Sequence, residues 1–242
     1  MQQLSISFSC WTIILLVAAV ATATDVFPED LNDDCIIDIS HPIKNFIPSV
    51  DSTINPEEII KVHLGTITVT STFNFSSHLG TNVAAPSYIF KNLRQTVTVD
   101  SLKVSTLIGP VLVVQTPNNS NITENVLRSL SIPREVKRVI FKTQNTDGQL
   151  MDKRDYTGFT ADGAKYLVDY TDIKFVGIDY MSVARKDEIA AVHQILLDPN
   201  KGIIPVGNLK LDQVNPGFYS MNCLPLRILT AAAPVRCILV KN

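Results

Sequence analysis

The chain alternates between many short segments rich in β-branched and apolar residues and a few segments with helical spacing. Residues 62–72 and 95–99 are largely β-branched and partly alternate between apolar and polar side chains, as half-buried strands do. Residues 107–114 form a continuous apolar run, which is typical of a strand buried on both faces. Further strands are expected over residues 35–40, 136–143, 173–179, 219–229 and 235–240.

Three segments carry apolar side chains at helical spacing, which predicts helices over residues 121–130, 159–170 and 186–197. Asn121 is the expected N-cap of the first helix, because Glu124 follows three residues later, and Thr160 is the expected cap of the second. The helices are interspersed among the strands without strict alternation. The sequence therefore predicts a single domain of α/β or mixed α+β architecture.

The first residues have the pattern of a secretory signal peptide. An apolar run over residues 11–20 is followed by small residues, although no Lys or Arg precedes it, and the run is too short to span a bilayer. We expect residues 1–23 to be a cleaved signal peptide, residues 24–34 a mobile acidic leader, and residues 35–242 the folded domain. The expected location is extracellular (the apoplast) or within the secretory pathway, without membrane association after cleavage.

That route makes three asparagines candidate glycan acceptors, because Asn74, Asn118 and Asn121 each begin an Asn-x-Ser/Thr tripeptide. It also places the cysteines in an oxidising compartment. Cys223 and Cys237 fall on consecutive expected strands, and the sequence allows either a bridge or two small buried side chains.

Composition narrows the classes of function. With 45% apolar residues, 242 residues suffice for one well-packed domain. A formal net charge of −2 offers no basic stripe, so a nucleic acid is not an expected partner. No Gly-x-Ser-x-Gly nucleophile elbow, phosphate loop or dinucleotide fingerprint is present.

Residues 78–88, His-Leu-Gly-Thr-Asn-Val-Ala-Ala-Pro-Ser-Tyr, would on their own indicate only a strand end and a tight turn. They resemble the hallmark of the cyclase family, whose known activities include kynurenine formamidase and whose motif runs His-x-Gly-Thr-His-x-Asp-Ala-Pro-x-His. The frame of the motif recurs here as His78, Gly80, Thr81, Ala85 and Pro86.

The chemical groups of the motif are largely replaced. Asn82 stands where the family has its second His, Ala84 where it has a metal-binding Asp, and Tyr88 where it has the catalytic His. A family His on the helix after Gly-Ile-Asp is kept as His193, whereas a family Glu before Leu-Lys-Leu-Asp is replaced by Gly207.

The resemblance extends over essentially the whole chain from residue 35. It is to the plant branch of the family in residues 158–164, 172–174, 176–184, 209–212, 223–227 and 235–239. It implies a cyclase/formamidase-like domain with a mixed β-sheet core and flanking helices. Family members commonly form dimers or tetramers, so the resemblance also implies a homo-oligomer.

In the family, imidazoles and carboxylates hold Mn or Zn ions, which lower the pKa of bound water from about 15.7 to about 7. Ala84 and Gly207 remove the anionic ligands, and two imidazoles alone bind a metal weakly. We therefore expect that the ancestral metal site is lost and that the protein has no metal or other cofactor.

Three functions remain open. The first is a secreted, non-catalytic relative that binds a small molecule or a protein partner, with Tyr88 filling the space of the lost metal. The second is a metal-independent cyclase or isomerase of plant specialised metabolism, in which Tyr88 acts with His78 and His193, since a phenol is a usable proton donor. The third is a residual metal-dependent amide or lactone hydrolase that has recruited other carboxylates.

Overall fold

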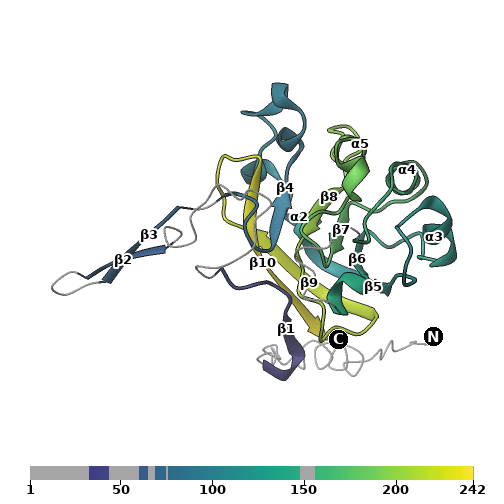
Figure 1. Ribbon diagram of the computed structural model, residues 1–242, viewed down its shortest axis with the longest axis horizontal. Helices are drawn as coiled ribbons and strands as arrows, with labels where there is room; N and C mark the ends of the chain where they lie inside the picture. The colour runs from purple at the N-terminus through teal and green to yellow at the C-terminus, as the bar shows by residue number, and fades with distance from the viewer. Residues whose placement is uncertain (1–32, 44–59, 65–68, 75, 148–155, 242) are drawn as a thin grey trace, which may run out of the picture. The chain divides into compact units, whose positions relative to one another are not determined.

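The structure, a computed structural model, describes residues 33–43, 60–64, 69–74, 76–147 and 156–241 (Figure 1). Contacts within the chain define two units, residues 1–33 and 34–242, and the fold described below is that of the second. The predicted signal peptide and almost all of the predicted leader lie outside the described residues, so both stay predictions.

Eight strands form one closed sheet, in the order β1-β10-β4-β8-β7-β6-β5-β9, with β9 also paired to β10. Their bounds are β1 Ile36–Asp38, β4 Asn82–Ala84, β5 Ile108–Gln115, β6 Arg138–Lys142, β7 Phe175–Ile178, β8 Ile204–Gly207, β9 Gly217–Pro225 and β10 Ala232–Lys241. Strands β5 to β8 are parallel, and the remaining pairs are antiparallel. This barrel-like mixed sheet with few helices confirms the predicted fold class.

Apolar side chains pack on both faces of the closed sheet. Successive residues of a strand point to opposite faces, so Ile140 of β6 joins the core inside the barrel, whereas Val139 and Phe141 join the core outside it. The outer core lies beneath three helices, α3 Glu124–Ser129, α4 Ala161–Tyr170 and α5 Ile189–Leu196, which Figure 1 shows on one side of the strands. A one-turn helix, α2 Val104–Leu107, leads directly into β5.

The caps of the helices were predicted with mixed success. Thr160 caps α4 as predicted, because its side chain accepts a hydrogen bond from the Gly163 N–H. The cap of α3 is Thr123, whose hydroxyl accepts from the Val126 N–H, so the prediction of Asn121 is wrong by two residues. The side chain of Asn121 instead accepts a hydrogen bond from the N–H of Gly158, which is distant in the sequence.

Two strand predictions are wrong. Residues 62–72 do not form one strand: they contribute to β2 Ile60–Leu64 and β3 Val69–Phe73, which pair antiparallel in a separate two-stranded sheet. Residues 95–99 form no strand, and the chain between β4 and α2 instead makes 3-10 turns at Pro86–Tyr88, Lys91–Leu93 and Val99–Ser101. β-branched composition alone distinguishes neither a hairpin from a single strand nor a strand from a packed loop.

A disulfide joins Cys223 to Cys237, which face each other across β9 and β10 with their Cα atoms 4.1 Å apart. The Cys237 N–H turns away from β9 and donates to the Ser40 hydroxyl, so the two cysteines form a non-hydrogen-bonded pair, in which side chains approach most closely. Of the two arrangements that the sequence left open, the structure contains the bridge, and Cys35 is a free thiol.

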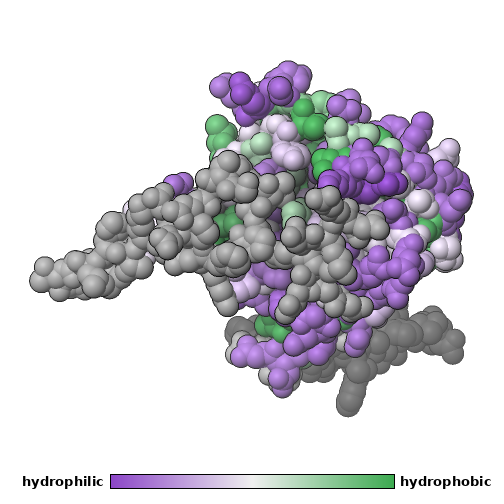
Figure 2. Space-filling model, in the orientation of Figure 1, coloured by the Kyte–Doolittle hydropathy of each residue, from purple (hydrophilic) through white to green (hydrophobic). Residues whose placement is uncertain are grey.

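The surface seen in Figure 2 is predominantly polar, with separate smaller apolar patches. Exposed large apolar side chains over the described chain include Tyr170, Phe218, Leu226 and Leu229. None of the helices in the described residues is long and apolar enough to cross a membrane.

Candidate functional site

The retained frame of the hallmark holds three parts of the fold together. Gly80 has a φ of +64°, a conformation that favours glycine. The buried Thr81 hydroxyl accepts a hydrogen bond from the His41 N–H at 2.9 Å and donates one to the Asn208 carbonyl at 2.6 Å. The Thr81 carbonyl also accepts from the Val235 N–H. Thr81 thus joins the turn after β1, the residue after β8 and strand β10.

Asn82 uses its amide to close the same turn. Its Nδ2 donates to the carbonyls of His78, at 3.2 Å, and Gly80, at 2.9 Å. It is the first residue of β4 and lies opposite Gly207 of β8. The structure therefore brings together Asn82 and Gly207, two positions at which the resemblance implies family ligands, and the Asn82 amide bonds to backbone carbonyls.

The two positions at which the family resemblance implies carboxylates, Ala84 and Gly207, face the outside of the barrel. Val83 and Val206 point into the barrel core, so the alternation of side chains places Asn82, Ala84 and Gly207 on the opposite face of β4 and β8. Ala84 and Gly207 offer no donor atom for a cation on this face.

The three predicted catalytic side chains come together from three separate segments. His78 precedes β4, Tyr88 ends the 3-10 turn Pro86–Tyr88, and His193 lies on α5. The ring of Tyr88 lies 4.7 Å from that of His78 and 5.3 Å from that of His193, measured between centroids. These are distances of direct ring contact, so Tyr88 touches both imidazoles. Tyr88 is 37% exposed and His193 only 7%, which makes Tyr88 the outer member of the cluster.

Burial sets the charge of the two imidazoles. It lowers the pKa of His78, an effect that the Asn82 side chain opposes, and it lowers the pKa of His193, where the nearby His78 acts in the same direction. The Nδ1 atom of His193 lies 2.7 Å from the Ile189 carbonyl oxygen, which can only accept, so Nδ1 carries the proton. Neutral His193 therefore bears its lone pair on Nε2.

The residues present do not fit the metal that the family resemblance implies. Across the described part of the chain, no group of three or more His, Cys, Asp or Glu side chains is placed to hold an ion. His78 and His193 are the retained imidazoles, and Tyr88 contacts both of them. Because a divalent cation needs charged ligands to offset the cost of its dehydration, this donor set is too poor for Mn or Zn.

Asp179 is a buried carboxylate that was not among the predicted site residues. Its carboxylate accepts hydrogen bonds from the N–H and hydroxyl groups of both Thr143 and Thr146. Burial raises the pKa of Asp179, although these hydrogen bonds act in the opposite direction. The carbonyl of the next residue, Tyr180, accepts a hydrogen bond from the N–H of Asn208, whose own carbonyl accepts one from the Thr81 hydroxyl. The signal in the sequence was the place of this carboxylate directly after the apolar residues 175–178.

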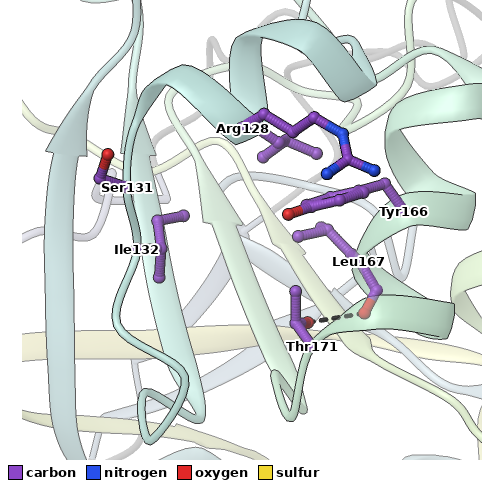
Figure 3. A pocket seen from close by; sticks show the side chains of 7 residues that line it. Arg128, Ser131, Ile132, Tyr166, Leu167 and Thr171 are labelled. Carbon is purple, nitrogen blue, oxygen red and sulfur yellow. Dashed lines mark hydrogen bonds between the residues drawn. The ribbon is translucent and has the colours of Figure 1, made fainter.

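A separate hollow of about 80 Å³ lies between α3 and α4, where Arg128 stacks over Tyr166 with its guanidinium carbon 4.7 Å from the ring centroid (Figure 3). None of the predicted site residues lines it. Its volume is well below the roughly 300 Å³ of small ligand pockets, so we do not assign it to the functional site.

Comparison with known proteins agrees with this fold. The family described as "Putative cyclase" matches residues 37–185. Cyclase-like protein 2 of Oryza sativa subsp. japonica is 41% identical over 216 residues, covering 85% of this chain and 79% of that protein. Kynurenine formamidase of Bacillus cytotoxicus is 26% identical over 214 residues, covering 84% of this chain and 96% of the relative.

Among solved structures, one described as a predicted metal-dependent hydrolase from Bacillus stearothermophilus superimposes with a TM-score of 0.72 at 27% identity, covering 86% of this chain and 98% of the other. The match to the family covers more than half of the chain, and the predicted resemblance is confirmed. The chain belongs to the cyclase family.

Proposed function

We propose that this protein is a cyclase-family member without metal-dependent hydrolase activity, and that its site around Tyr88 binds a small molecule or a protein partner. The observation that carries the proposal is the position of Tyr88, whose ring contacts both retained imidazoles. An aromatic ring in that place occupies space beside the His side chains that a shared ion and its water would need.

The absence of charge at the site supports the same conclusion. Ala84 and Gly207 cannot supply carboxylates, and the pKa values of His78 and His193 are lowered, so both imidazoles are neutral near pH 7. A site of neutral rings with one phenol suits a ligand held by stacking and by a few hydrogen bonds. It does not supply the Lewis acid on which metal-assisted hydrolysis depends.

The retained hallmark does not argue against a loss of hydrolysis. Gly80 adopts the positive φ of the turn, and the Thr81 hydroxyl forms the hydrogen bonds to His41 and Asn208. Neither role depends on a metal. A chain that lost the chemistry would still need them in order to fold. Presence of the frame is therefore compatible with a binding protein.

A second candidate function is metal-independent proton transfer, such as ring closure or isomerisation of a small molecule. The observation in its favour is the tautomer of His193, which leaves a basic Nε2 on a neutral imidazole whose ring contacts Tyr88. A base and a phenolic proton donor next to each other are the minimum set for such a reaction.

A ligand screen by thermal shift, followed by calorimetry and product analysis on each hit, tests the proposal. Saturable binding with no product supports the binding function. Turnover that is unaffected by chelator and abolished in Tyr88→Phe would instead establish the second candidate. Chelator-sensitive hydrolysis would contradict both and restore the residual hydrolase.

We also propose that the protein works outside the cell or in the secretory pathway, as a homo-oligomer. The signal-peptide pattern of residues 1–23 supports the location, and the dimers and tetramers common in the family support the homo-oligomer. Secretion from cells that express the full chain, and light scattering of the purified protein, test them.

A further inference from the structure

Two candidate glycosylation sequences follow one another directly in the loop between β5 and α3, Asn118-Asn119-Ser120 and Asn121-Ile122-Thr123. The sequence rule treats both as acceptors. The two asparagines, however, have different roles in the fold. We propose that the protein carries an N-linked glycan on Asn118 and none on Asn121, along the secretory route that the first residues predict.

Asn118 is free to carry a large substituent. It is exposed, and within the described residues no hydrogen bond involves its side chain. Its neighbour Asn119 adopts a φ of +57° and donates its N–H to the Gln144 side chain at 2.8 Å. The turn is therefore held by residues next to Asn118, and a sugar on the Asn118 amide displaces no contact of the fold.

Asn121 is part of the packing between segments. It is only partly exposed, and its Oδ1 accepts a hydrogen bond from the Gly158 N–H at 3.3 Å. The next residue, Ile122, is fully buried, exchanges backbone hydrogen bonds with Gly158 and Thr160, and forms a parallel bridge with Phe159. A glycan on the Asn121 amide nitrogen would start from a side chain whose oxygen is held at the seam where these two segments meet.

The third residue of that sequence is also engaged. The Thr123 hydroxyl accepts from the Val126 N–H and caps α3, an interaction worth about 1 kcal/mol. Presenting Asn121 to a transferase would mean opening both the cap and the seam. Folding therefore competes with transfer at Asn121, whereas Asn118 stays available before and after folding.

The transfer itself is a substitution without any change in oxidation state. The side-chain amide nitrogen of Asn118 attacks the anomeric carbon of a lipid-linked oligosaccharide, presented by the transferase of the endoplasmic reticulum. A C–N bond forms, the C–O bond to the lipid diphosphate breaks, the amide loses one proton, and the lipid diphosphate leaves.

The test is to express the full chain with its own leader in plant cells. Enzymatic deglycosylation in heavy-oxygen water then labels each asparagine that carried a glycan, and peptide fragmentation in a mass spectrometer distinguishes Asn118 from Asn121. Label on Asn118 alone is the expected result. Two variants provide a matched check. Asn118→Gln should lose one glycan, whereas Thr123→Asp, which removes the second sequence but keeps a capping side chain, should leave the glycan pattern unchanged.

Label on Asn121, or a glycan lost in Thr123→Asp and kept in Asn118→Gln, would overturn the proposal. A chain that leaves both asparagines unlabelled would overturn it as well. Because the mapping is done on the wild-type protein, the result does not depend on either variant folding.

Discussion

Replacing Thr81 by Val tests whether the retained residues of the hallmark stabilise the fold. The two side chains have nearly the same shape, so the change removes the hydroxyl and little else. It leaves the His41 N–H and the Asn208 carbonyl without their bonds at 2.9 and 2.6 Å, and Thr81 is only 2% exposed. An unsatisfied buried polar group costs about 1–3 kcal/mol, so the expected loss of unfolding free energy is about 3 kcal/mol.

The assay is urea denaturation followed by far-ultraviolet circular dichroism. A protein of this size has a stability of about 5–15 kcal/mol, so the variant should still fold and show a lower midpoint with an unchanged slope. Thr96→Val is the matched control, because Thr96 is exposed and its hydroxyl makes only a long 3.4 Å bond to the Leu93 carbonyl. If Thr81→Val costs no more than this control, the structural account of the frame is wrong.

Three further predictions concern the site and the barrel. Burial lowers the pKa of His193 in the folded protein below its ordinary 6.5, so below about pH 6.5 the unfolded chain binds a proton that the folded chain resists, and the free energy of unfolding should fall. The variant His193→Gln should make the free energy of unfolding less dependent on pH between 7.5 and 5.5. An equal pH dependence in both proteins would refute this prediction. The variant Gly207→Glu should lose about 1–3 kcal/mol of unfolding free energy and bind no metal, because a Cβ at this position lies 3.1 Å from the carbonyl oxygens of Tyr180 and Met181. A variant that is as stable as the wild type and carries metal would contradict this prediction. Reduction of the Cys223–Cys237 bridge, which closes a 14-residue separation, should cost about 3 kcal/mol, and an unchanged melting temperature in reductant would argue against its role.

Periodicity and capping predicted the parts of the fold in which local preference and tertiary packing agree. The apolar run at 107–114 became β5, and the Thr160 cap was found because its hydroxyl bonds within its own helix. Strands β4 and β8 were not predicted, since three or four residues carry too little pattern and their pairing partners lie far away in the chain. The prediction of Asn121 as a cap was wrong for a related reason, because its side chain accepts a hydrogen bond from a distant residue, Gly158.

The candidate site was predictable only as a set of residue positions. The resemblance identified His78, Tyr88 and His193, and the fold places their rings in contact. No local pattern could indicate that Asn82 would turn its amide onto the carbonyls of its own turn, or that Asp179 would accept hydrogen bonds from Thr143. Those contacts become visible only in the folded chain, and those of Asn82 give the motif frame a structural role that does not depend on a metal.

The most direct test of the central claim is the metal content of the protein, purified without chelator, with manganese and zinc then titrated by calorimetry. Hydrolysis of a formylated aromatic amine is measured alongside at each metal concentration. We predict well under one bound ion per chain, weak binding of added metal and no hydrolysis above background, because Ala84 and Gly207 supply no carboxylate and Tyr88 contacts both imidazoles. One tightly bound ion per chain with chelator-sensitive hydrolysis would contradict the account.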